Sequence, residues 1–333
     1  MGSVCTPRSN RRKRSMPSNS KPVDAPIPLG LVKAEGLVQP AAVIAFTEGP
    51  AVDLDGNVFF SDIQNNRIMK LAASGELSIF RADSGRANGN MFDREGRLVT
   101  CEGDEFGPGG RRRVTRTNMQ TGEVEVLTDS FDGKKYNSPN DVCIDTQGNI
   151  FFTDPRYDDP AGKELDVEGV YRIDTAGNVK RVLDNNQVQK PNGLALTPDD
   201  STLYVIDSNP LAGGNRKIWA FAVGADGSMS EQRLVYDFGK GRGGDGMRVD
   251  MNGNLWVAAG INRPRGRPSE TLDVPTGVYI ITPAGEILGR IPIPEETVTN
   301  LTFGPPNRTT LYVTSGKTLF TIPIGVSGYV LYA

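Results

Sequence analysis

Six polar side chains recur at one point of a repeated segment in this 333-residue chain. Each stands eight residues before a turn position and carries a carbonyl or carboxylate oxygen, the set being Glu48, Asn88, Asn140, Asn192, Asp245 and Asn300. Amides and carboxylates that converge without a counterion are costly to desolvate. A hard cation with roughly six to eight oxygen ligands removes that cost, and Ca²⁺ accepts this mixture better than Mg²⁺. Local capping of each strand is the alternative, but it does not explain six positions in register.

The sequence contains no histidine, which excludes several kinds of catalytic and metal-binding site. Ser-His-Asp and Cys-His catalysis and His-ligated zinc are excluded, which leaves carboxylates, amides, Lys, Tyr or an oxygen-bound metal. Cysteine is sparse, with Cys5, Cys101 and Cys143 only. An odd, sparse set is not a disulfide framework and indicates a reducing compartment. Cys101 and Cys143 are expected to be small buried apolar residues in strands.

Each of the six residues begins a segment with the same order of elements. A short strand of alternating apolar and polar residues comes first, then a turn, then a second, apolar strand. The alternation predicts strands buried on one face. Turn pairs such as Asp55-Gly56 and Asn252-Gly253 predict tight hairpins. Further strand-like stretches follow, for example residues 169–173 and 179–183. About four strands per unit, repeated at roughly 40–55 residues, is typical of a β-propeller.

The sequence therefore predicts an all-β fold, a six-bladed β-propeller with a central metal-binding channel, over residues 29–333. Missing helical periodicity excludes α/β barrels and doubly wound folds, and a sandwich does not explain six copies of one unit. Because the first strand of each blade lines the channel, the six polar residues form a ring. Residues 37–46 are predicted to supply an outer strand that closes the ring with the last blade.

Four acidic residues lie 14 or 15 positions after their ring partners and belong at the same channel mouth: Asp62, Glu102, Asp154 and Asp207. They either hydrogen-bond the ring amides, contact substrate, or bond one blade to the next, and the sequence leaves these readings open. Two long loops, residues 103–112 and 156–168, are predicted to shape the pocket.

The first 28 residues form a basic leader rich in Ser, Pro and Arg, predicted to be disordered. No apolar run follows Arg11-Arg12-Lys13-Arg14, so this is not a secretory signal, and a cytoplasmic location is expected. The first six residues fit the N-myristoylation pattern, with Cys5 as a second acylation site. Membrane association is expected only through such acylation, and a solvated tail is the alternative. The oligomeric state is left open.

Charge is divided unevenly between the leader and the body. Residues 1–33 hold seven Lys and Arg against one Asp in a chain of net charge −3, so the remainder carries −9. An acidic body disfavours nucleic acid as a partner.

Several separated motifs resemble the gluconolactonase, SMP-30 and luciferin-regenerating family of metal-dependent propellers, from about residue 40 to the end. They are Thr47-Glu48-Gly49-Pro50, Asn137-Ser138-Pro139-Asn140-Asp141, Phe152-Thr153-Asp154-Pro155, Pro191-Asn192-Gly193-Leu194 and Gly244-Asp245-Gly246-Met247. The resemblance implies four cation ligands, Glu48, Asn140, Asn192 and Asp245, with Asn140 on the metal or on the substrate. It implies Ca²⁺ first, with Zn²⁺, Mn²⁺ or Mg²⁺ as alternatives. Ser138 departs from the animal members, which carry an arginine there, so the lactone contacts of that arginine are not carried over.

The function that this resemblance implies is metal-dependent hydrolysis of a lactone, a sugar lactone before others. Asp245 is expected to act as general base or, alternatively, as nucleophile. The residues expected to meet the substrate are Asn88, Asn90, Glu102, Asn140, Asp154, Tyr157 and Asn300. The alternatives are a non-catalytic Ca²⁺-binding propeller that serves as a binding platform, a phosphotriesterase-like or esterase-like hydrolase, and a synthase-type propeller. Residues 239–244 fit a GxGxxG pattern but precede a strand, so they are interpreted as a loop that leads into Asp245.

Overall fold

The computed structural model describes residues 30, 31, 33, 38–157, 162–264 and 270–331. The predictions for the leader, residues 1–28, lie outside the described residues. Within the described part of the chain, no helix is long and apolar enough to cross a membrane.

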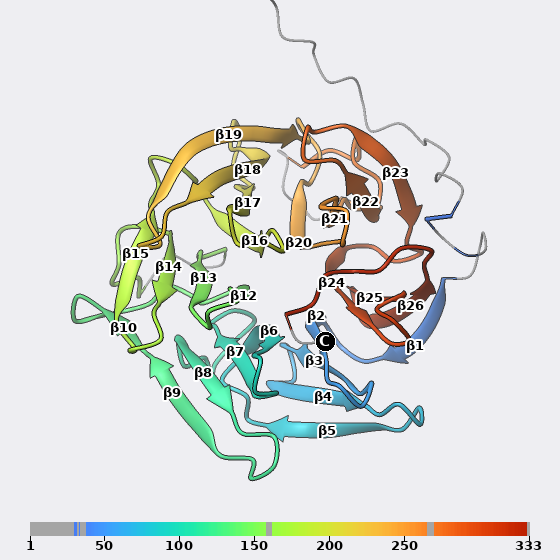
Figure 1. The fold of residues 1–333 in the computed structure, drawn as a ribbon, viewed down its shortest axis with the longest axis horizontal. Helices are drawn as coiled ribbons and strands as arrows, with labels where there is room; N and C mark the ends of the chain where they lie inside the picture. Colours follow the sequence, from blue (N-terminus) through green and yellow to red (C-terminus); the bar gives the residue numbers. More distant parts are fainter. Residues whose placement is uncertain (1–29, 32, 34–37, 158–161, 265–269, 332–333) are drawn as a thin grey trace, which may run out of the picture.

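Six four-stranded antiparallel sheets surround a central axis, which confirms the six-bladed propeller (Figure 1). Blade 1 contains β2 (Thr47–Val52), β3 (Val58–Asp62), β4 (Arg67–Leu71) and β5 (Leu77–Ala82). Blade 2 contains β6 (Ala87–Phe92), β7 (Leu98–Glu102), β8 (Arg113–Thr117) and β9 (Val124–Thr128). The short ribbon β10 (Ser130–Phe131) and β11 (Lys134–Lys135) leads to blade 3, which contains β12 (Val142–Ile144), β13 (Ile150–Asp154), β14 (Gly169–Ile173) and β15 (Val179–Leu183).

The second half of the ring repeats the plan. Blade 4 contains β16 (Pro191–Leu196), β17 (Thr202–Ser208), β18 (Arg216–Val223) and β19 (Met229–Asp237). Blade 5 contains β20 (Gly244–Val249), β21 (Leu255–Ala259), β22 (Gly277–Ile281) and β23 (Ile287–Pro292). Blade 6 contains β24 (Val298–Gly304), β25 (Thr310–Ser315) and β26 (Thr318–Pro323), and its outermost strand is β1 (Gln39–Val43).

Strand β1 joins the two ends of the chain. It pairs antiparallel with β26, Gln39 opposite Thr321 and Val43 opposite Thr318. This confirms the predicted closure of the ring by the segment before the first inner strand. Closure in this way pairs the last blade with the start of the chain, so the ring has no open seam.

The hairpins between the first two strands of each blade have the predicted geometry. Backbone φ is positive at all six turn positions, namely Gly56, Gly96, Gly148, Asp200, Gly253 and Arg308. In four blades an aspartate directly after the first strand accepts a backbone hydrogen bond across the turn. In blade 3, for example, Asp145 Oδ1 accepts the N–H of Asn149 at 2.8 Å, and Asp53, Asp93 and Asp250 repeat this contact.

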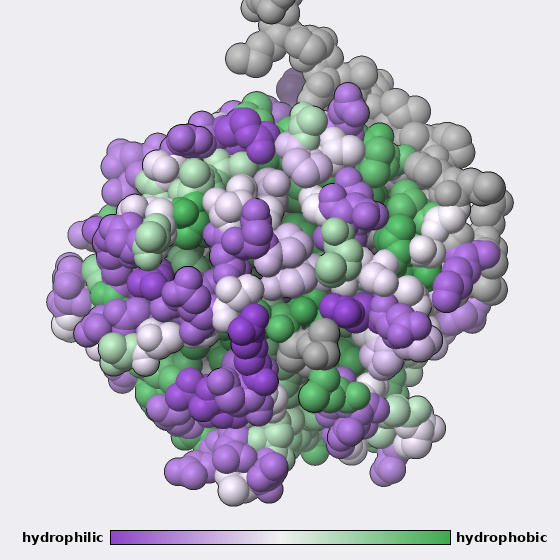
Figure 2. Space-filling model, viewed as in Figure 1, coloured by the Kyte–Doolittle hydropathy of each residue, from purple (hydrophilic) through white to green (hydrophobic). Residues whose placement is uncertain are grey.

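The core is divided among six hydrophobic clusters, each lying between two neighbouring blades. In β13, Ile150 and Phe152 pack toward blade 2 and Phe151 packs toward blade 4. The inner strands are therefore buried on both faces, and the prediction of one buried face was wrong. The reason is that every blade is covered by a neighbour on each side. On the face seen in Figure 2, hydrophobic residues lie interspersed among hydrophilic ones.

Cys101 and Cys143 belong to these clusters, free and buried, as predicted. Burial raises the pKa of both thiols well above the usual value, which makes them unreactive.

The segment that follows β26 crosses the axis. Tyr329 donates its N–H to Val249 O at 2.9 Å, beside the turn of blade 5, and packs on the cluster between blades 4 and 5. Leu331 reaches the cluster between blades 2 and 3. This segment therefore ties distant blades together at the turn end of the channel.

Candidate functional site

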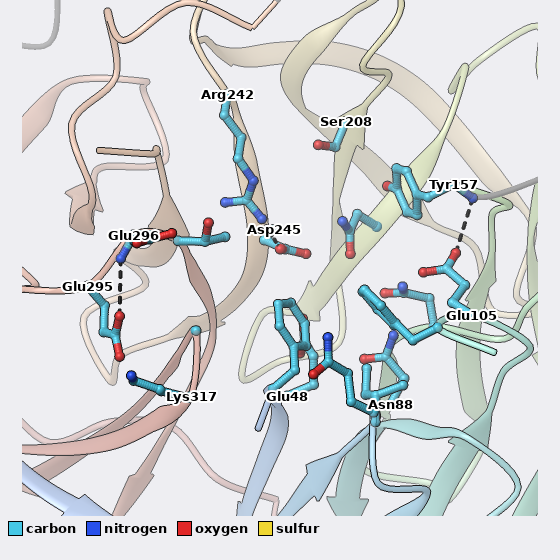
Figure 3. A pocket seen from close by; sticks show the side chains of 18 of the residues that line it. Glu48, Asn88, Glu105, Tyr157, Ser208, Arg242, Asp245, Glu295, Glu296 and Lys317 are labelled. Atoms are coloured by element: carbon cyan, nitrogen blue, oxygen red, sulfur yellow. Dashed lines mark hydrogen bonds and ion pairs between the residues drawn. The ribbon is translucent and has the colours of Figure 1, made fainter. Parts of the chain in front are cut away.

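A cavity of about 530 Å³ opens at the channel mouth, and five of the six ring residues line it: Glu48, Asn88, Asn140, Asn192 and Asp245. They come from five blades, at or just before the start of the innermost strands (Figures 1 and 3). The sixth, Asn300, lies behind the lining, where it donates Nδ2–H to Asp141 Oδ2 at 3.3 Å.

Glycines bring the inner strands close enough for the ring to form. A Cβ on Gly49 would lie 2.1 Å from Asn88 O, and one on Gly193 would lie 2.3 Å from Asp245 O. Gly89 and Gly246 meet Asn140 O and the Asn300 side chain in the same way, at 2.6 and 2.1 Å. In four blades the ring residue is followed by a glycine. Any larger residue there would place its Cβ on the ring residue of the next blade.

Two of the ring residues are carboxylates with little access to water. Glu48 is 5% exposed and Asp245 is 8% exposed. Burial first, and then the negative charge of Asp245, raises the pKa of Glu48 well above its usual value, although the Gly49 N–H donates to Glu48 Oε2 at 2.8 Å. A bound cation would relieve both the burial and the repulsion.

The donor set fits a hard divalent cation. Among the described residues, no three His, Cys, Asp or Glu side chains gather closely enough to bind a metal by themselves. The two carboxylates therefore need the amide oxygens of Asn140 and Asn192, which line the same cavity, to complete a ligand set.

The two loops that were predicted to shape the pocket supply part of its wall. Glu105 and Phe106 come from the first loop and Tyr157 from the start of the second. Glu105 Oε1 accepts the Tyr157 N–H at 3.1 Å, the contact drawn in Figure 3. Within the described part of the chain, the Tyr157 hydroxyl is buried and has no hydrogen-bond partner. Burial, followed by the charge of Asp245, raises the pKa of Tyr157 well above its usual value, so the phenol keeps its proton.

Four residues that were predicted to meet the substrate lie outside the cavity lining: Asn90, Glu102, Asp154 and Asn300. Asn90 donates to Gly49 O at 2.9 Å, joining blades 1 and 2. Glu102 accepts from Arg81 at 2.8 Å and Arg113 at 2.6 Å.

Asp154 supports the chain segment that carries Asn140. It accepts the N–H groups of Asn137 at 2.8 Å and Ser138 at 2.7 Å. Burial raises the pKa of Asp154 to about 7, and these two N–H groups oppose the shift. Asp207 and Asp62 accept backbone N–H groups in the same manner, from Lys190 at 2.9 Å and from Phe46 at 3.3 Å. Asp62 also accepts from the Arg67 side chain at 2.8 Å. Of the readings that the sequence left open, bonding from one blade to the next fits Glu102, which pairs with Arg81 of blade 1. Asp62, Asp154 and Asp207 instead bond to a strand or loop of their own blade, a role that the sequence did not predict.

Sequence reasoning missed several cavity residues, namely Ser208, Arg242, Glu270, Glu295, Glu296, Thr297 and Lys317. Most lie in connections that lead from the fourth strand of one blade to the first strand of the next, where no periodicity marks them. Arg242 had a signal, since it stands three residues before Asp245 in the glycine-rich loop. Its guanidinium is buried and forms an ion pair with Asp245.

Comparisons with known proteins agree with this geometry. A family model described as the SMP-30/Gluconolactonase/LRE-like region matches residues 46–317. A gluconolactonase of Zymomonas mobilis is 31% identical over 294 residues, which cover 81% of this chain and 76% of that protein.

Two solved structures show the same fold. A gluconolactonase from Xanthomonas campestris superposes with a TM-score of 0.73 at 28% identity, covering 92% of this chain and 99% of that one. A calcium-binding regucalcin from Agrobacterium tumefaciens superposes with a TM-score of 0.69, covering 90% and 95%. At 18% identity, the second likeness concerns the fold alone.

Proposed function

Because the chain belongs to the SMP-30/gluconolactonase/LRE-like family, we propose that it hydrolyses a lactone and that this reaction depends on a divalent cation in the central channel. The observation that carries the proposal is the convergence of two buried carboxylates and three amides, from five blades, on one cavity. Lactonases among its relatives support the reaction class.

Glu48, Asn140, Asn192 and Asp245 are the residues that would hold the cation, and Ca²⁺ suits their oxygen atoms first. When bound, such a cation polarises a carbonyl group or lowers the pKa of water.

Asp245 is the group proposed to accept the proton of the attacking water. It lies at the channel axis and its carboxylate faces the cavity (Figure 3). Asn88, Asn140 and Tyr157 would orient the substrate, since each lines the cavity with a polar group. Asn90, Glu102, Asp154 and Asn300 are better assigned to supporting the site, because their contacts hold blades and loops together.

A sugar lactone fits the cavity by size and polarity. About 530 Å³ lies within the range of small-molecule sites, roughly 300–1,000 Å³. The lining offers amides, carboxylates and hydroxyls, which match the several hydroxyl groups of a sugar.

A hydrolysis screen tests the proposal. Acid release would be followed with sugar lactones, simple γ- and δ-lactones, an aryl ester and a phosphotriester, each with Ca²⁺, Zn²⁺, Mn²⁺ or chelator, and with spontaneous hydrolysis subtracted. We expect turnover of at least one sugar lactone with a cation and none with chelator, and no cation binding or turnover in Asp245→Ala. Activity that survives complete cation removal contradicts the proposal. If chelation lowers the melting temperature but no compound is hydrolysed, the binding-platform alternative holds instead.

A further inference from the structure

Arg242 is a buried cation in a cavity that is otherwise mostly acidic. Its side chain is 7% exposed and lines the cavity, together with the carboxylates of Glu48, Glu105, Asp245, Glu270, Glu295 and Glu296. Among the described residues of the lining, the other cation is Lys317, which is exposed. In Figure 3 the guanidinium points toward Asp245 from the loop above it. Negative charge that develops inside the cavity can therefore be stabilised by the buried guanidinium of Arg242.

The loop between β19 and β20 is built to place this side chain. A Cβ on Gly241 would lie 2.3 Å from the Val274 side chain, and one on Gly244 would lie 2.9 Å from Ile206. A Cβ on Gly243, the residue after Arg242, would lie 3.0 Å from the Cβ of Arg216. The three glycines let the loop backbone pack closely against Val274, Arg216 and Ile206. Arg242 is therefore the one residue of 241–244 with a side chain, and that side chain lines the cavity.

The hydrogen bonds of the guanidinium leave donors for a bound molecule. Nη1 donates to Val298 O at 2.8 Å and to Gly260 O at 3.4 Å, and Nη2 donates to Asp245 Oδ2. A guanidinium has five N–H groups. Among the described residues, the Nε–H and the second N–H of Nη2 meet no hydrogen-bond acceptor, while the two carbonyls fix the plane of the group.

We propose that Arg242 is a catalytic residue that donates hydrogen bonds to the carbonyl oxygen of the lactone as that oxygen gains negative charge. This inference rests on the proposed function. Water adds to the carbonyl carbon and gives one proton to the base, and the carbonyl oxygen takes up the electron pair of the π bond. The bond between that carbon and the ring oxygen then breaks, the ring oxygen takes a proton, and a hydroxycarboxylate is released with one net proton. The product carboxylate keeps the oxygen that Arg242 binds, so Arg242 also binds the product.

Variants at position 242 test this. In Arg242→Met, we expect kcat to fall about 10²- to 10³-fold, the range for loss of one oxyanion donor. We expect KM to change much less, and Arg242→Lys to recover part of the loss because it restores one charged donor. Calorimetry with the product hydroxycarboxylate and Ca²⁺ should show at least tenfold weaker product binding to Arg242→Met.

The matched control is Arg86→Met, because Arg86 is also buried and donates to backbone carbonyls, at Ile63 O and Gln64 O, but lies outside the cavity lining. This control should lose stability and keep kcat.

Three outcomes overturn the inference: an unchanged kcat in Arg242→Met, unchanged product binding, or full recovery of its kcat at raised Ca²⁺, which would mean that Arg242 only holds Asp245 for the cation. If the wild type hydrolyses no lactone, the proposed function fails as well. If the wild type is active and Arg242→Met is equally active, only the role of Arg242 is refuted.

Discussion

At the scale of single residues, the buried hydroxyl of Tyr157 has no hydrogen-bond partner in the described protein, so a molecule in the cavity is the natural acceptor. Tyr157→Phe should leave stability nearly unchanged and lower kcat/KM for the lactone about 10-fold, the worth of one hydrogen bond of about 1.5 kcal/mol. Initial rates and urea unfolding would measure the two effects.

Tyr136 gives the matched control, because its hydroxyl lies 2.8 Å from Thr128 Oγ1 in the core. Tyr136→Phe should lose about 1 kcal/mol of stability and no activity. An unchanged kcat/KM in Tyr157→Phe would remove Tyr157 from the site.

Asp154 provides a prediction for pH dependence. Its folded-state pKa of about 7 is above the ordinary value of 3.8, so between these two pH values the folded state holds a proton that the unfolded state has lost. The free energy of unfolding therefore falls as pH rises through this window and levels off above it. Between about pH 5 and about pH 7.5, wild type should lose about 2 kcal/mol more than Asp154→Asn, measured by urea unfolding. Equal pH slopes in the two proteins would show that Asp154 is ionised throughout.

At the scale of elements, two kinds of glycine serve different purposes in the inner hairpins. Gly148 has φ +93° with its nearest obstacle at 3.7 Å, so Gly148→Ala should cost about 1 kcal/mol of stability through backbone strain alone. Gly193 faces Asp245 O at 2.3 Å, so Gly193→Ala must push blades 4 and 5 apart at the ring. We expect at least tenfold weaker cation binding in Gly193→Ala and none of that loss in Gly148→Ala, measured by calorimetry. Equal cation affinities would contradict the close-approach argument.

The same elements explain how much was predictable from the sequence. The ring and the fold followed from a repeat whose register is set by turn residues, because hairpin geometry is local. Arg242 and Glu270 were missed because long-range packing, rather than periodicity, brings their loops to the channel. The repeat pattern could not predict the hydrogen bonds of Asp154 either. They depend on the path of residues 137–138, which lie before the first strand of the blade.

At the scale of the whole molecule, the segment after β26 adds contacts that neighbouring blades do not make with one another. Leu331 is buried in the cluster between blades 2 and 3, far along the chain from its partners. Leu331→Ala should lower the free energy of unfolding by about 2 kcal/mol and leave cation affinity unchanged. Leu211→Ala, at a site that is 68% exposed, should change it by less than about 0.5 kcal/mol. Urea unfolding measures both, and equal effects would show that the segment does not stabilise the ring.

The central claim is that one divalent cation is held on the axis by oxygen atoms from four blades. Calorimetric titration of Ca²⁺ into chelator-treated protein tests it most directly. We predict one cation per chain, with binding lost in Glu48→Gln and in Asp245→Asn and retained in Asp237→Asn, whose carboxylate lies outside the cavity lining. Absence of binding in the wild type, or unchanged binding in both ring variants, would contradict the account.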